Sequence, residues 1–140
     1  MISILKRVYD VPGDDFSRAG EASSALKRTL KELGFKPEII RKVAIATYEA
    51  EINMVIHANG GVITAIVSPE CVTVEFADRG PGIPDIALAM QEGWSTATDN
   101  VRELGFGAGM GLPNIKKYTD ELDLKTELGV GTTLKISVNA

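Results

Sequence analysis

The sequence predicts an α/β two-layer sandwich (α+β), in which a mixed, mostly antiparallel sheet is covered on one face by helices. Helical and strand segments do not alternate as repeated βαβ units, which argues against a doubly wound parallel sheet. Four of the strand segments form two pairs with short turns, as in hairpins. With 140 residues, 44% of them hydrophobic, the chain suits a single domain, residues 1–140, that buries its own core.

The first half of the chain is predicted to form a strand followed by two helices. Residues 2–9 are β-prone and end at a turn cluster, 11–15, which also supplies a helix N-cap. From Phe16 onward, apolar residues keep helical spacing until Gly34 ends the run. A second helix, 37–58, is apolar around most of its circumference and is expected to be buried on several sides.

A line of polar residues interrupts this second helix. Glu49, Asn53 and His57 recur at every fourth position and therefore share one face. Polar groups on a buried helix need partners, which are either structural, from backbone and water, or a ligand. Glu51 lies off this line and is expected to be solvated. His57 is expected to be a hydrogen-bonded helix residue, because the chain has no second His to complete a metal site.

The next segment is predicted to be a hairpin that ends in a carboxylate. Its strands, 62–68 and 70–77, are joined by a short turn. In the second strand apolar and polar residues alternate, so Asp78 falls on the same side as Val74 and Phe76, facing the core. Asp78 either caps the glycine turn that follows or binds a ligand, and its inward parity favours binding.

A long polar segment, 83–104, follows the hairpin. A short helix is expected at 84–90, with a mobile loop after it. A loop of this length is uncommon in a compact domain unless it serves as a lid or binding loop. A helix at 112–118 and a second hairpin, with strands at 121–125 and 132–138, end the sequence.

Glycines lead directly into the helix at 112–118. Gly107, Gly109 and Gly111 allow close backbone approach to a ligand, and the helix N-terminus that follows favours an anion, most simply phosphate. The run is not a P-loop, because G-x-x-x-x-G-K-[ST] is absent, and its spacing misses the dinucleotide fingerprint G-x-G-x-x-G. The H-R-D and D-F-G motifs of ordinary protein kinases are absent too.

Four motifs resemble, in order and spacing, the N, G1, G2 and G3 boxes of the GHKL ATPases: Glu49-x-x-x-Asn53, Asp78-x-Gly80-x-Gly82, Gly107-Ala108-Gly109-Met110-Gly111-Leu112 and Gly129-Val130-Gly131-Thr132-Thr133. Within that superfamily the chain resembles the anti-sigma-factor serine/threonine kinases, and their switch-kinase (RsbT-like) branch most closely. The runs 78–85, 91–97 and 111–113 carry this finer resemblance. It covers nearly the whole chain and implies the Bergerat ATP-binding fold.

The resemblance also implies roles for the matched residues. Glu49 would be the catalytic base that takes the proton from an attacking hydroxyl. Asn53 would hold Mg²⁺ through its carbonyl oxygen, since hard cations prefer oxygen ligands. Asp78 would accept the adenine amino group. The other residues implied to contact ATP are Gly80, Gly82, Ile83, Gly107, Gly109, Met110, Gly111, Leu112 and Thr132.

The implied function is an ATP- and Mg²⁺-dependent protein serine/threonine kinase of a bacterial partner-switching pathway for stress or sigma-factor control. Its partners would be a small antagonist (STAS-type) protein, as substrate, and a downstream regulator or sigma factor. Two alternatives stay open: an ATP-binding module that sequesters a regulator without relevant kinase activity, and a detached ATPase domain of a histidine phosphorelay. A homodimer is a further open possibility.

The composition restricts the kinds of binding partner and the cellular compartment that we expect for the protein. A net charge of −4 and a pI near 5.0 argue against a general nucleic-acid binder. No apolar run approaches a membrane span or a signal peptide, and the single Cys71 suits a reducing compartment, so a cytoplasmic protein is expected. Arg79 and Arg102 contact either phosphate or protein, and Trp94 and Phe106 either pack the loop or face a partner.

Overall fold

The computed structural model describes residues 5–12, 18–57, 60–78, 111–127 and 130–140. Within these ranges the elements are, in chain order, β1 (Leu5–Pro12), α1 (Glu21–Glu32), α2 (Pro37–His57), β2 (Gly60–Ser68), β3 (Cys71–Asp78), α5 (Gly111–Lys117), β4 (Glu121–Glu127) and β5 (Gly131–Asn139). The helix expected at 84–90 and the loop that follows it lie outside the described residues.

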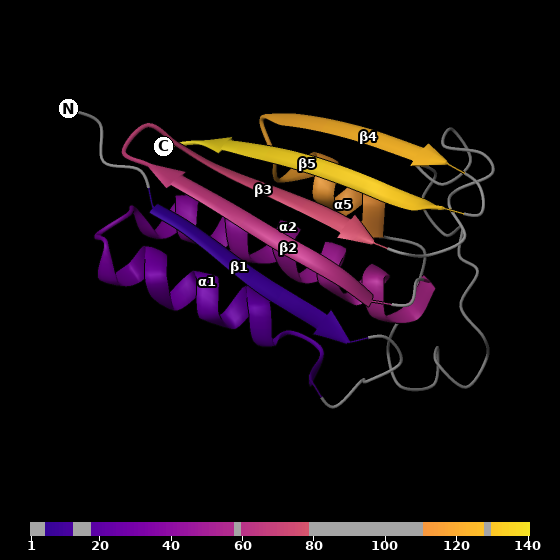
Figure 1. Ribbon diagram of the computed structural model, residues 1–140. Coiled ribbons are helices and arrows are strands. Elements are labelled where there is room, and N and C mark those ends of the chain that lie inside the picture. The colour runs from indigo at the N-terminus through magenta and orange to yellow at the C-terminus, as the bar shows by residue number, and fades with distance from the viewer. Residues whose placement is uncertain (1–4, 13–17, 58–59, 79–110, 128–129) are drawn as a thin grey trace.

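The strands form one sheet in the order β1-β2-β3-β5-β4, and each neighbouring pair is antiparallel. Helices α1, α2 and α5 lie together behind this sheet in Figure 1. The predicted two-layer α+β architecture is therefore confirmed, including both hairpins. Among the described residues, no helix is long and apolar enough to cross a membrane.

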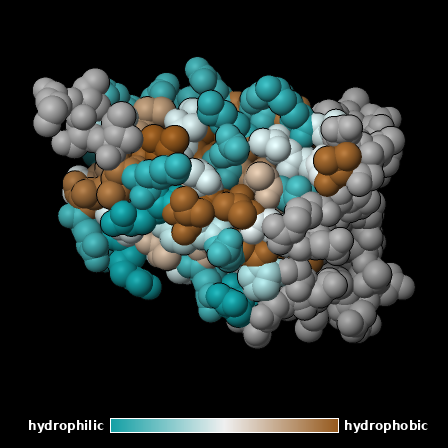
Figure 2. Space-filling view, viewed as in Figure 1, coloured by the Kyte–Doolittle hydropathy of each residue, from teal (hydrophilic) through white to brown (hydrophobic). Residues whose placement is uncertain are grey.

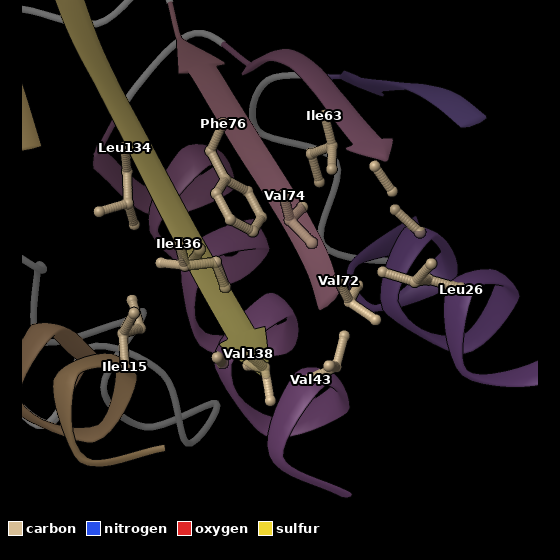
Figure 3. Packing of buried hydrophobic residues seen from close by; sticks show 14 of the residues in the cluster. Leu26, Val43, Ile63, Val72, Val74, Phe76, Ile115, Leu134, Ile136 and Val138 are labelled. Carbon is tan, nitrogen blue, oxygen red and sulfur yellow. The ribbon is translucent and has the colours of Figure 1, made fainter. Parts of the chain in front are cut away.

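The core lies between the sheet and the helix layer. In β3, Val74 and Phe76 are buried while Glu75 is exposed, which is the period of two that the sequence predicted. Figure 3 shows side chains of β3 and β5 meeting Leu26 of α1 and Ile115 of α5. This packing fixes the end of β3, and with it Asp78, relative to the helices.

The opposite face of the sheet has no described element packed on it. Seen from that side, hydrophobic and hydrophilic residues are intermixed (Figure 2). Val8 of β1 and Ile66 of β2 are the large apolar residues exposed there, at 58% and 42%. Since the inward strand positions carry the buried apolar residues, the sheet is stabilised mainly through its helix-covered face.

Helix α1 begins at Glu21, later than the predicted start near Phe16. Its N-cap is Gly20, which has a left-handed φ of 95° and supplies no side-chain cap. The N-cap of α1 is therefore not in the predicted cluster, 11–15, of which Val11 and Pro12 belong to β1 and residues 13–15 lie outside the described part. The helix ends as expected, with Gly34 in a left-handed conformation at φ 82°.

Glu51 of α2 caps α1 from outside. Its carboxylate accepts hydrogen bonds from the backbone N–H groups of Gly20 and Ala22, at 3.1 Å each, and of Ser23, at 3.0 Å. The expectation that Glu51 is solvated is wrong: the residue is only 2% exposed. Three donors and the positive end of the α1 dipole compensate the buried charge, and they join the two helices.

Candidate functional site

The predicted site residues that the structure describes lie on α2, at the start of α5 and around the end of the sheet where β3 stops and β5 begins. Asp78 is the last residue of β3, and Thr132 is the second residue of β5. A Cβ added at Gly61, the register partner of Asp78, would lie 2.7 Å from Cε of Met54. Because Met54 follows Asn53 on α2, the second half of that helix runs beside the end of β3.

Asp78 is held by β5. Its Oδ1 accepts the backbone N–H of Thr132 at 2.9 Å. One oxygen of the carboxylate is therefore oriented by a neighbouring strand. The inward parity that the sequence predicted agrees with the burial of Val74 and Phe76 in the same strand.

Two glycines leave room for this arrangement. A Cβ added at Gly61 would meet the carbonyl oxygen of Ala77 and come within 2.8 Å of Cα of Asp78. A Cβ added at Gly131 would meet the backbone oxygen of Asp78 and come within 3.3 Å of its Oδ1. Gly131 also has a φ of 152°, at the edge of the range that favours glycine. Any side chain at either position would displace Asp78.

A second threonine continues the contacts outward from Asp78. Thr126 of β4 and Thr132 of β5 are register partners, and their Oγ1 atoms lie 3.0 Å apart. Thr132 is buried, with 9% exposed, and Thr126 is half-buried. Sequence reasoning identified Thr132 but missed Thr126, because the pairing of β4 with β5 in this register is not visible in local periodicity.

Glu49 is half-buried on α2, and burial raises the pKa of its carboxyl group above its ordinary value. A hydrogen bond from the Asn114 side chain acts in the opposite direction and lowers the pKa. Asn114 belongs to α5, which packs against α2 and buries Ile115 completely. Sequence reasoning missed Asn114, although it is the first amide side chain after the glycine run.

Asn53 follows Glu49 by one helical turn and is likewise half-buried. The two side chains offer an amide oxygen and a carboxylate on one face, a donor set that suits a hard cation. The described residues contain no cluster of three or more His, Cys, Asp or Glu that could hold a metal by itself. An ion held by Asn53 would take further ligands, such as oxygens of a bound phosphate group.

Two predicted site residues lie on α5: Gly111 opens the helix, and Leu112 packs against the core. Several others cannot be compared with the structure. His57 ends α2, and its side chain is outside the described part. The other residues outside the described ranges are Arg79, Gly80, Gly82, Ile83, Trp94, Arg102, Phe106, Gly107, Gly109 and Met110.

A family model described as "Histidine kinase-like ATPase domain" matches residues 14–138. The chain belongs to this family, as the resemblance to the GHKL ATPases predicted. An ATPase domain binds ATP, which is the nucleotide expected from the four motifs.

Two similar proteins bear on the class of protein within this family. Serine/threonine-protein kinase RsbT of Bacillus subtilis (strain 168) is 32% identical over 113 residues, which cover 78% of this chain and 79% of that protein. Anti-sigma F factor of Caldanaerobacter subterraneus subsp. tengcongensis is 33% identical over 140 residues, covering 95% of this chain and 90% of that protein. The first of these relatives confirms the predicted enzyme class, a protein serine/threonine kinase.

A solved structure shares the fold. The match is a chain in the SiaB-SiaC complex from Pseudomonas aeruginosa, with a TM-score of 0.62 over 96% of this chain and 89% of that one. The identity is 16%, so this likeness shows the fold alone.

Proposed function

We propose that the protein is a single-domain, ATP- and Mg²⁺-dependent serine/threonine kinase that phosphorylates a small antagonist protein of the STAS type in the bacterial cytoplasm. The observation that carries this proposal is Glu49, a half-buried carboxyl group with a raised pKa, on the same helix face as Asn53. A pKa raised towards the working pH improves a general base, provided that the group is still deprotonated there.

The nucleotide base is recognised by Asp78. The carboxylate accepts the adenine amino group, while its Oδ1 is held by the Thr132 N–H. A buried acceptor discriminates against bases that lack this donor, because it would be left unpaired. Gly61 and Gly131 keep the Asp78 backbone in place. Asp78 therefore binds and positions the nucleotide and takes no part in phosphoryl transfer.

Phosphoryl transfer uses Glu49 as the base. The hydroxyl oxygen of the substrate serine or threonine attacks the γ-phosphorus of ATP, the bond from that phosphorus to the bridging oxygen breaks, and ADP leaves. Glu49 takes the hydroxyl proton. The Asn53 amide oxygen would hold Mg²⁺, which when bound would supply neutralisation of phosphate charge. Most of the rate enhancement comes from positioning and electrostatics.

Support for the protein substrate comes from the relatives. One is named a serine/threonine-protein kinase and another an anti-sigma F factor, and both align over most of this chain. A STAS-type antagonist as substrate, with a sigma factor or other downstream regulator as second partner, unites these two activities in one partner-switching protein. A homodimer is compatible with this scheme.

A second candidate function is sequestration without relevant phosphorylation. It is favoured by the anti-sigma F factor relative, whose match extends over 95% of this chain. In that case ATP serves as a structural ligand, and the partner is a sigma factor or similar regulator.

The test is incubation with γ-labelled ATP, Mg²⁺ and candidate STAS-type proteins. The kinase proposal expects acid-stable phosphate on a serine or threonine of one candidate. Sequestration expects regulator binding with no phosphate transfer. An acid-labile phosphohistidine on a partner would instead indicate a part of a histidine phosphorelay.

A further inference from the structure

A groove of about 500 Å³ lies where α1 and the residues just before it meet α2, and these two helices run side by side in Figure 1. Its lining consists mainly of four small residues, Ala19, Gly20, Ser24 and Ala25, with the longer side chains of Arg28 and Tyr48 above them. The groove is open to solvent. Small-molecule sites enclose most of the ligand surface, so an open groove favours a segment of another protein as its occupant.

Tyr48 is already held in place at this groove. A Cβ added at Gly20 would lie 3.1 Å from Cε1 of Tyr48, so the ring lies against that glycine. The Gly20 N–H in turn donates to the buried Glu51 carboxylate at 3.1 Å. Tyr48 nevertheless remains 41% exposed. An exposed aromatic ring with one side already packed loses little conformational freedom on binding, which suits an anchor residue in a protein interface.

Arg28 gives the groove a positive charge. Glu21, which also lines the groove, is paired with Nε of Arg18 at 3.1 Å, whereas Arg28 is exposed and makes no ion pair within the described part of the chain. The region around it is basic as well, since residues 18–57 carry seven Lys or Arg against five Asp or Glu, although the whole chain has a net charge of −4. Opposite charges steer association, so this region favours an acidic partner segment.

The position of the groove relative to the proposed base indicates which partner it fits. Tyr48 directly precedes Glu49 on α2, and successive helical positions diverge by about 100°. The groove and the base therefore lie on neighbouring faces of one helix. A protein held in the groove stands beside the group that takes the hydroxyl proton, and phosphoryl transfer requires such positioning of the substrate. A regulator that is only sequestered has no such requirement.

We propose that this groove docks an acidic segment of the protein substrate, with Tyr48 as the apolar anchor and Arg28 as the ionic contact. The inference rests on the proposed function, in which Glu49 is the base of a protein kinase. Tyr48 and Arg28 are not among the residues assigned to ATP. Contacts made equally in the ground state and the transition state lower KM for the protein substrate and leave kcat and ATP affinity unchanged.

The test uses the STAS-type protein that accepts phosphate in the labelled-ATP assay, with steady-state kinetics for that protein and calorimetry for ATP. Tyr48→Ala should raise KM for the protein substrate about 10- to 30-fold, the scale of an aromatic anchor, with kcat and ATP affinity near the parental values. Tyr48→Phe, which keeps the ring, should have a KM close to that of the parent. Ile66→Ala removes an apolar side chain of similar exposure, 42%, on the open face of the sheet, and should leave KM unchanged.

Arg28 is tested by its charge. Arg28→Glu should raise KM for the protein substrate about tenfold at low salt and by much less at high salt, because salt screens the interaction. Arg28→Lys keeps the charge and should stay near the parental KM. Lys27→Glu is the matched control, since Lys27 is the exposed neighbour of Arg28 on α1 but does not line the groove. It changes the net charge equally and should leave KM unchanged.

Three results would overturn the inference alone. These are an unchanged KM in folded Tyr48→Ala, an unchanged KM in Arg28→Glu, and a KM raised as much by Lys27→Glu as by Arg28→Glu. A parental dimer that dissociates in Arg28→Glu, measured by light scattering, would assign the groove to a second copy and overturn the inference too. Thermal unfolding gives the folded fraction, and the variants of exposed Arg28 decide the question if Tyr48→Ala does not fold. A parent that phosphorylates no candidate would instead overturn the proposed function, and this inference with it.

Discussion

Glu49 and Glu51 lie two residues apart on α2, yet their surroundings differ in kind. Glu51 is 2% exposed, and its two oxygens accept three backbone N–H groups at the start of α1. Glu49 is half-buried, its pKa is raised by burial, and its described partner is one side-chain amide, that of Asn114. Successive positions on a helix diverge by about 100° in direction, so Glu51 faces α1 while Glu49 faces α5.

The contrast separates a structural carboxylate from one suited to chemistry. A carboxylate that accepts several backbone N–H groups holds those groups in place and serves the fold. One that is partly desolvated and incompletely compensated binds a proton more readily, which is what a general base requires. Function is therefore expected at the less well satisfied of the two residues, and this expectation can be tested.

The largest effect is expected for Glu49→Gln. This nearly isosteric change should leave ATP binding intact and reduce phosphorylation of a cognate antagonist by ~10²-fold or more, the usual scale for losing a general base. Single-turnover transfer and calorimetry measure the two separately. Glu51→Gln is the control, and its folded fraction should transfer phosphate at the parental rate. Parental transfer by Glu49→Gln would remove Glu49 as the base.

Glu51→Gln should instead reduce stability. The amide cannot present two anionic oxygens to three N–H groups, so a cost of about 2 kcal/mol in the free energy of unfolding is expected. Urea unfolding at pH 7 measures it, with Glu21→Gln on the exposed start of α1 as a comparison. A change below a few tenths of a kcal/mol would mean that the capping contacts do not stabilise the fold.

Asp78 extends the comparison to a third carboxylate, whose Oδ1 accepts the Thr132 N–H. Asp78→Asn should weaken ATP binding by more than ~1 kcal/mol, since an ionic acceptor is replaced by a group that can present a donor to the adenine amino group. Calorimetry with ATP and Mg²⁺ checks this. The variant should keep the parental affinity for inorganic triphosphate, which lacks a base.

Asn114 supplies a finer test of the Glu49 environment. Its hydrogen bond lowers the Glu49 pKa, so Asn114→Ala should raise that pKa further. The acidic limb of the kcat/KM profile should then move to higher pH. Lys116→Ala, an exposed change on α5, should leave the profile in place. An unmoved limb in Asn114→Ala would separate Asn114 from the base.

The sequence predicts features that depend on local periodicity, and it misses those that depend on contacts between distant segments. Asp78 was placed correctly because strand alternation is a property of neighbouring residues. Glu51 was misjudged because its partners come from α1, and an N-cap supplied by another helix leaves no local signal. Asn114 and Thr126 were missed for the same reason, since α5 meets α2 and β4 meets β5 only in the folded chain.

The smallest expected effect is the stability change of Glu49→Gln, which is opposite in sign to the loss expected for Glu51→Gln. Burial raises the Glu49 pKa in the folded state, so the folded protein binds a proton more readily than the unfolded chain. Between the ordinary glutamate pKa and the raised one, stability therefore falls as pH increases, and above both the full cost of the desolvated anion remains. Glu49→Gln removes that cost, and the variant should unfold at a slightly higher temperature than the parent at pH 7. The gain should vanish as the pH drops below the ordinary glutamate pKa, because the parent residue is then neutral in both states.

Thermal unfolding of Glu49→Gln and Glu51→Gln across this pH range measures the sign of the stability change in each variant. A loss of stability in Glu49→Gln at pH 7 would show that its carboxylate is satisfied like that of Glu51, and the distinction between them would no longer identify the base.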